Sequence, residues 1–337
     1  MLTMQINALN NRWFNWSIKF LLAALLVWAI YRQVFAKEEA DEIWASFQFH
    51  FRSGNWHWLW WNALLIPVNW LLETLKWRHL IKGFSNYSLW RTFQAILAGV
   101  SVGIFTPNRV GEYGGRVLLV KAKHNWRAVI STMVGSLAQM LILLSFGLIG
   151  AIYFATHYLE VAAQQINWLI GLGSVGVILM WIAFYNIRHL LAWIKRFEWI
   201  HRFERYTKHL EVLTHYDAKA LSIALLYSFL RYLTYSTQYY FMLRFFGIDL
   251  SLVVAYSGIA TIYLIQSSIP LPPYLDLLAR GEVALLIWSG FTTDEMAIFG
   301  STFTLFIFNL MVPALFGMLI IFKSNIAQSL GLRRRDE

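Results

Sequence analysis

The chain has 337 residues, of which 58% are hydrophobic and only 14% are charged, with a formal net charge of +10. Soluble chains carry about 25% charged residues, so this composition excludes an ordinary soluble enzyme and predicts an all-α polytopic membrane protein. We attribute the basic excess to a positive-inside bias rather than to nucleic-acid binding. The chain has no cysteine, which excludes disulfides and thiolate metal sites.

Six apolar runs approach the length of roughly 20 residues that a membrane span requires. They cover residues 17–35, 56–75, 128–154, 167–187, 219–243 and 296–322. No small-residue cleavage site follows the first run, so we expect a retained span rather than a signal peptide. The single membrane domain is expected to comprise two N-terminal spans (1–79), a first repeat unit (80–155), a span with a basic segment (156–218), a second repeat unit (219–323) and a basic tail (324–337).

Two further apolar regions, 92–120 and 250–292, are interrupted by polar and helix-breaking residues. Each predicts a re-entrant helical hairpin with a polar tip, because the arms are short for a complete span. The first arm of the second region approaches 20 residues, so a complete span is the alternative there. The expected structural residues of the two tips are Pro107, Gly111, Pro270, Pro272 and Gly281.

Charge distribution predicts the orientation of the chain. With a cytoplasmic N-terminus, 20 of the 28 Lys and Arg residues fall on the cytoplasmic side, as the positive-inside rule requires. We therefore expect both termini in the cytoplasm and the chain in a bacterial plasma (inner) membrane. The basic, amphipathic segment 188–218 is expected to lie on the cytoplasmic leaflet as an interfacial helix, with a solvated loop as the alternative.

A shift of 170 residues brings the two polar regions into register. Gly111-Glu112 then matches Gly281-Glu282, and Phe146-Gly147 matches Phe316-Gly317. Because the first hairpin enters from the cytoplasm and the second from outside, the two units would be inverted relative to each other. Inverted repeats with broken helices are typical of transporters.

Charged residues at membrane depth mark functional sites, because they are costly unless they are paired or hydrated. Glu112 and Arg116 share a helix face and can pair, which leaves Arg109 to recruit an anion. Asp276 and Arg280 have the same spacing, and self-neutralised structural clusters are the alternative at both tips. The candidate residues for binding a lipid headgroup are Arg109, Glu112, Arg116, Arg231, Asp276, Arg280 and Glu282.

Arg231 lies in the middle of the span 219–243. Its guanidinium group is suited to holding a phosphate bidentately, or alternatively to pairing with Glu112 or Glu282 for packing. Gln139 and Asn309 each lie within a long span, where interhelical hydrogen bonding is the expected role.

The sequence contains no Gly-x-Ser-x-Gly, His-Glu-x-x-His or phosphate-loop motif and no cluster of metal ligands. We therefore expect no catalytic residue, no metal and no cofactor.

The segment Thr106-Pro107-Asn108-Arg109-Val110-Gly111-Glu112, with a second Pro…Gly-Glu segment later in the chain, resembles the flippase-like membrane region of lysylphosphatidylglycerol synthases. The resemblance covers nearly the whole chain, as a stand-alone member without the transferase domain. Residues 272–280 depart from the glycine-rich stretch of many members. The resemblance implies movement of lipids between leaflets or binding of lipid headgroups, and not aminoacyl-lipid synthesis.

Three functions are therefore compatible with the sequence. The first is translocation of membrane lipids with anionic phosphate headgroups. The second is a non-catalytic membrane partner of envelope lipid enzymes. The third is an intramembrane lipid-modifying enzyme with Glu112 or Glu282 as a general base.

Overall fold

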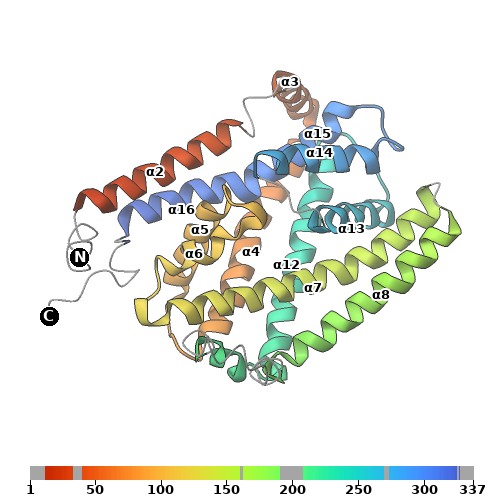
Figure 1. The fold of residues 1–337 in the computed structure, drawn as a ribbon. Coiled ribbons are helices and arrows are strands. Elements are labelled where there is room, and N and C mark those ends of the chain that lie inside the picture. Colours follow the sequence, from red (N-terminus) through yellow and green to blue (C-terminus); the bar gives the residue numbers. More distant parts are fainter. Residues whose placement is uncertain are drawn as a thin grey trace.

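The computed structural model describes residues 12–32, 40–159, 162–189, 208–268, 273–324 and 326. Within these residues every regular element is a helix, which confirms the predicted all-helical class (Figure 1). In chain order the elements are α2 (Arg12–Ile30), α3 (Ala40–His50), η2 (Phe51–Asn55), α4 (Trp56–Ile81), α5 (Leu89–Gly103), η3 (Pro107–Arg109), α6 (Gly111–Val117), η4 (Ala122–His124), α7 (Asn125–Tyr158), α8 (Ala163–Tyr185), η5 (Lys208–His215), α12 (Ala218–Phe245), α13 (Leu252–Ser268), α14 (Pro273–Trp288), α15 (Glu295–Phe306), η6 (Ile307–Met311) and α16 (Val312–Lys323).

Each of the six expected spans coincides with a helix, but they differ in apolar character. Three helical stretches are long and apolar enough to cross a membrane: Ala122–Tyr158, Ala163–Tyr185 and Glu295–Lys323. Asn15–Ile30 and Leu252–Ser268 are shorter apolar helices. Helices α4 and α12 have 26 and 28 residues, which is sufficient length, but both carry charged side chains. The number of six spans therefore stays a prediction.

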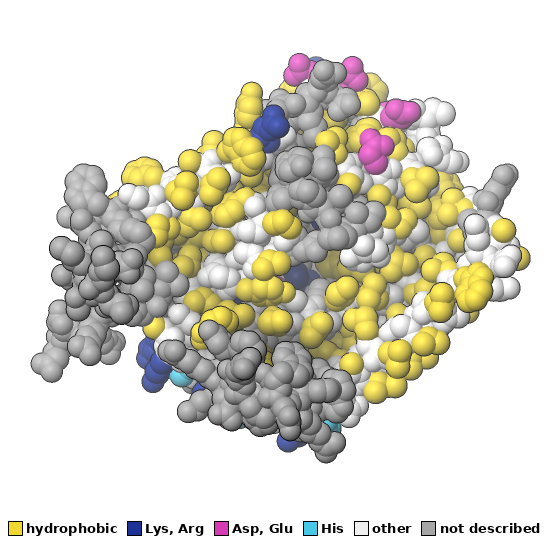
Figure 2. Space-filling view, in the orientation of Figure 1, with side chains coloured by type: hydrophobic (Ala, Val, Ile, Leu, Met, Phe, Trp, Pro, Cys, Tyr) yellow, Lys and Arg dark blue, Asp and Glu magenta, His cyan; other side chains and the backbone are white. Residues whose placement is uncertain are grey.

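The surface of the body is largely apolar (Figure 2). Helix α8 has a single buried residue, Phe184, although most of its sequence is apolar, as expected of a helix that faces lipid. The Asp and Glu side chains visible in this view gather at its upper edge, where a basic side chain also lies, whereas the lower edge shows basic side chains and His. This separation is compatible with the predicted orientation, which itself stays a prediction.

Helices α4 and α12 pack along each other at the centre of the molecule (Figure 1). Three buried apolar clusters surround them. One lies among α2, α4, α5 and α16, a second among α7, α8, α12 and η5, and a third among α12, α13, α14 and α15. The central pair therefore touches all three clusters, and any polar group on its inner faces is enclosed by the rest of the fold.

The predicted first hairpin is present as α5, η3 and α6. Thr106 is extended, as expected of a residue before proline, and its hydroxyl accepts a hydrogen bond of 2.8 Å from the N–H of Gly111. Gly115 allows the arms to approach, since a Cβ there would lie 2.6 Å from the Ala98 carbonyl oxygen. The 15 residues of α5 span about 22 Å, less than the roughly 30 Å bilayer core. Its entry side stays a prediction.

The second hairpin comprises α13 and α14. Its tip, residues 269–272 with Pro270 and Pro272, lies outside the described residues, as does the side chain of Asp276. Gly281 is buried on α14 where that helix packs on the ring of Phe299 in α15. Residues 190–207, which make up most of the predicted interfacial segment, also lie outside the described residues.

The first arm of each hairpin packs on the long helix that follows the other hairpin. Helix α5 packs on α16, and α13 packs on α7. The contacts centre on the two glycines that the sequence repeat matches. Gly317 abuts the Leu97 carbonyl on α5, and Gly147 abuts Leu264 on α13. This reciprocal packing is what a two-unit repeat would produce at these positions. Inversion of the units across a membrane stays a prediction.

We expect Gly317→Ala to lower the free energy of unfolding by about 1–3 kcal/mol, the usual cost of overpacking. The reason is that the new methyl group would overlap backbone atoms of Leu97, which cannot move aside as a side-chain end can. Gly176→Ala on α8 is the control, since no atom lies within 4 Å of its Cβ position. Denaturation midpoints in detergent measure the difference, and equal midpoints for both variants would contradict the proposed close packing.

Candidate functional site

Ion pairs of alternating sign run from the surface into the centre of the molecule. Arg109, whose side chain is 37% exposed, pairs with Glu112, and Glu112 pairs with Arg116 at 3.1 Å. Arg116 pairs in turn with Glu73 at 2.8 Å, where both side chains are buried. This sequence of pairs is called the charge ladder below. It links the tip of the first hairpin to the central helix α4.

Glu73 forms the inner end of the ladder, and its carboxylate is shared by three cations. One oxygen, Oε1, accepts from Arg116, whereas Oε2 lies 2.8 Å from the Lys76 ammonium and 2.9 Å from the Arg231 guanidinium. The side chain of Glu73 is only 6% exposed. A charge in such surroundings would be costly alone, but here each carboxylate oxygen is satisfied by charge-assisted hydrogen bonds.

A cavity of about 500 Å³ opens beside the ladder, and a second of about 280 Å³ shares part of its lining. Figure 2 shows basic side chains at the bottom of a hollow in the middle of the apolar face. Among the side chains that the structure describes, five basic and two acidic ones line the larger cavity. They are Lys76, Arg109, Arg116, Arg231, Arg280, Glu73 and Glu112. The two cavities together are called the polar cavity below. The excess of positive charge in its lining makes it suited to an anion.

Amide side chains complete the wall of the polar cavity. Arg231 donates to Asn69 Oδ1 at 2.9 Å, and the Asn69 amide donates to Asn309 at 3.3 Å. Asn309 lies in the π-helix η6, a bulge of the kind often found at functional sites. Gln139 accepts from Lys76 and donates to the Ser228 carbonyl. Both Gln139 and Asn309 thus make interhelical hydrogen bonds.

The structure brings together most, but not all, of the candidate residues from the sequence. Arg109, Glu112, Arg116, Arg231 and Arg280 line one continuous cavity. Glu112 and Arg116 form the expected pair, but Arg109 also pairs with Glu112.

On the second hairpin, Arg280 donates to Gln266 at 3.1 Å. Glu282 is exposed and does not line the cavity. The pairing of Asp276 with Arg280 lies outside the described side chains. Arg231 pairs with Glu73, and neither Glu112 nor Glu282 is its partner in the ion pairs of the described part.

Neither Glu73 nor Lys76 is among the candidate residues from the sequence, where Lys76 falls just beyond the expected span 56–75 and is counted with the cytoplasmic basic residues. Helix α4 instead continues to Ile81, so Lys76 lies in the core at 1% exposed. The available signal was a Glu–Lys pair spaced i, i+3 inside an apolar helix, since such charges at membrane depth are functional by default.

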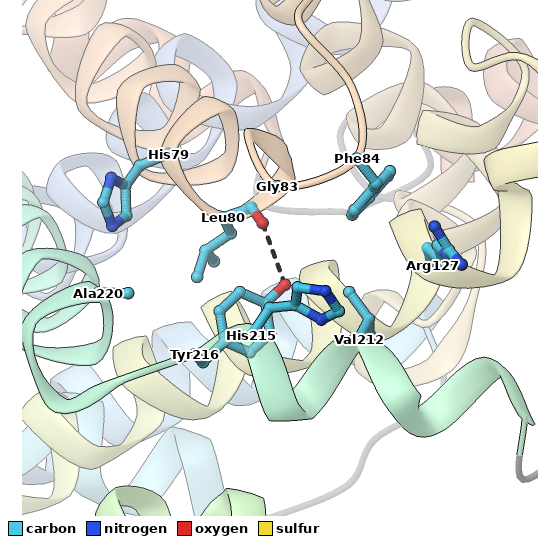
Figure 3. Close-up of a pocket in the computed structure, with 9 residues that line it drawn as sticks. All are labelled: His79, Leu80, Gly83, Phe84, Arg127, Val212, His215, Tyr216 and Ala220. Atoms are coloured by element: carbon cyan, nitrogen blue, oxygen red, sulfur yellow. Dashed lines mark hydrogen bonds between the residues drawn. The ribbon is translucent and has the colours of Figure 1, made fainter.

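A smaller cavity, of about 90 Å³, lies where η5 packs under α4 and α7 (Figure 3). Tyr216 donates to the Leu80 carbonyl at 3.1 Å and is bonded to the Ser131 hydroxyl. Burial raises the pKa of Tyr216 to about 12. At about 30 Å³ per water, this space holds only a few waters, so we interpret it as a packing contact between helices.

Among the described residues, no group of three or more His, Cys, Asp or Glu side chains is placed to hold a metal ion. The polar cavity is instead a cationic site enclosed by apolar helices.

The fold and this cavity together define an all-helical membrane protein with a charged interior site. Residues 16–317 match the family described as lysylphosphatidylglycerol synthase TM region, and the chain therefore belongs to that family. The match confirms the expected resemblance and associates the chain with membrane lipids. No curated protein and no solved structure matches the chain.

We expect Glu73→Gln to lower the free energy of unfolding by about 3–5 kcal/mol, because it leaves three buried cations without their shared carboxylate. Glu112→Gln is the matched control, and we expect a smaller loss because the Glu112 side chain is 16% exposed. Thermal unfolding in detergent measures both. An equal loss for the two variants would contradict the central role of Glu73.

Proposed function

We propose that this protein moves an anionic lipid between the leaflets of the membrane, with the lipid phosphate held in the polar cavity. The observation that carries the proposal is the excess of basic side chains around a cavity enclosed by membrane helices. A phosphate there would gain several charge-assisted hydrogen bonds and would offset the positive charge that Glu73 and Glu112 do not balance.

The charge ladder suggests how a phosphate would enter. Arg109 is the most exposed member and would meet the phosphate first. The Glu112 carboxylate occupies the place between Arg109 and Arg116 that a phosphate oxygen would take. Exchange of one anion for the other keeps both guanidinium groups paired throughout, so neither is left unpaired in a low-dielectric interior.

Arg231 and Arg280 extend the cationic lining toward the second hairpin. They line both parts of the polar cavity, together with Gln139 and Gln266. A phosphate that leaves the first hairpin therefore meets further donors before it reaches the apolar walls. The packing of each hairpin on the long helix of the other unit also supports alternating exposure, since the two units can rock against each other around a fixed site.

The test is transfer of fluorescent phosphatidylglycerol across proteoliposomes, followed by chemical quenching of the outer leaflet. We expect Arg231→Gln to slow transfer about ten- to hundredfold, the equivalent of one or two lost charge-assisted hydrogen bonds. Arg244→Gln is the control, because Arg244 pairs with Asp249 away from the cavity and should leave the rate unchanged.

The double variant Glu73→Gln/Arg231→Gln distinguishes a loss of folding from a loss of transfer. It removes both partners of one ion pair. We expect it to regain stability relative to Glu73→Gln but not to regain transfer. Unmodified protein that moves no labelled lipid, or equal rates for Arg231→Gln and Arg244→Gln, would overturn the proposal.

A further inference from the structure

A separate apolar groove of about 650 Å³ lies between α4, α5 and α16. Its walls include Pro67, Phe93, Leu97 and Phe316, and no acidic side chain of the described part lines it. Trp70 lines both this groove and the smaller part of the polar cavity. The two sites are therefore neighbours that share one aromatic wall, although their linings have opposite chemical character.

One end of the groove is basic. Lys323 and Trp90 lie at this end, because α5 and α16 run antiparallel past each other. The guanidinium of Arg91 donates to the carbonyl of Leu119, another residue of the lining. The Lys19 ammonium donates, at 2.7 Å, to the carbonyl of the residue before Lys323. Lys323 thus lines this end, and Arg91 and Lys19 bind backbone carbonyls next to it, while the opposite end, at Pro67, is apolar.

The position of the groove on a membrane helix indicates which kind of molecule it binds. Helix α16 belongs to the stretch Glu295–Lys323, which is long and apolar enough to cross a membrane, so its groove opens toward hydrocarbon. A groove with one basic, tryptophan-bearing end and apolar walls matches a molecule with an anionic head and an acyl chain.

We propose that the groove binds an anionic glycerophospholipid, with the phosphate at Lys323 and an acyl chain extending toward Pro67. This inference requires the membrane setting but does not require transport.

The shared wall connects this lipid to the polar cavity. The guanidinium of Arg231 lies 5.3 Å from the Trp70 ring on the cavity side. The indole N–H of Trp70 is buried and has no hydrogen-bond partner among the described residues. An acyl chain in the groove would pack against the same Trp70 ring, which separates the groove from the cavity.

The experiment uses the full chain in phosphatidylcholine nanodiscs with a trace of phosphatidylglycerol that bears a photoreactive acyl-chain end. We expect the crosslinks to concentrate on the groove residues of α4, α5 and α16. Leu319→Trp narrows the groove and should lower this labelling about tenfold, the equivalent of about 1.4 kcal/mol. Leu315→Trp, on the same helix and exposed but not part of the lining, is the matched control.

A second pair of variants tests the headgroup end. Lys323→Gln should lower labelling several-fold, whereas Lys219→Gln, an exposed lysine on α12 away from the groove, should not. Arg231→Gln should leave the labelling of the groove unchanged while it slows lipid transfer. The two measurements therefore test the groove and the proposed transport separately.

Labelling spread evenly over the exposed helices, including α8, would overturn the proposal. Equal yields for Leu319→Trp and Leu315→Trp would overturn it as well.

Discussion

The carboxylate of Glu73 is the interaction on which the rest of the site depends. It lies on the inner face of α4 and holds Lys76 of the same helix, Arg116 of the first hairpin and Arg231 of α12. Without it, three cations would be confined in a low-dielectric interior, where like charges repel strongly and desolvation is costly. One carboxylate thus joins two central helices and a hairpin into a single arrangement.

Among the described side chains, the lining of the cavity carries more positive than negative charge. A structural cluster that only packs helices together would be expected to balance its charges. Here, in the described part of the lining, five basic side chains and two carboxylates surround one cavity. Under the proposed function, an anion bound in the cavity would also stabilise the fold, because binding to the folded form adds to its stability.

Glycines and a helix bulge create the room that the site requires. Gly115 allows the arms of the first hairpin to approach, and this approach sets Arg116 within reach of Glu73. The π-helix η6 lies where Asn309 meets Asn69, beside Arg231. Farther along the same helix, Gly317 lets α16 pack against α5, and the apolar groove lies between these two helices and α4.

Much of the fold could be predicted from the sequence, because hydrophobic runs and helix breakers act locally. The six apolar runs became helices, and the segment around Pro107 and Gly111 became the turn of a helical hairpin. The pairing of Glu112 with Arg116 followed from i, i+4 spacing on one helix. The family membership was also predictable, because it was indicated by the local segment 106–112 and the second Pro…Gly-Glu segment.

The partners of the central charges could not be predicted in the same way. Glu73 and Arg231 are 158 residues apart in the chain, and only the packing of α4 against α12 brings them within 2.9 Å. The C-terminal end of α4 could not be predicted either. An apolar run shows where a helix is hydrophobic, but not how far the helix continues into polar sequence.

The sequence by itself thus determined a helical membrane protein with charges at unusual depth. The tertiary structure alone decided that Glu73 collects those charges and that the exposed Glu282 does not line the cavity. The physical reason is that a hydrogen-bonded ion pair requires contact at about 3 Å, so partners are selected by which helices pack together rather than by their distance along the chain.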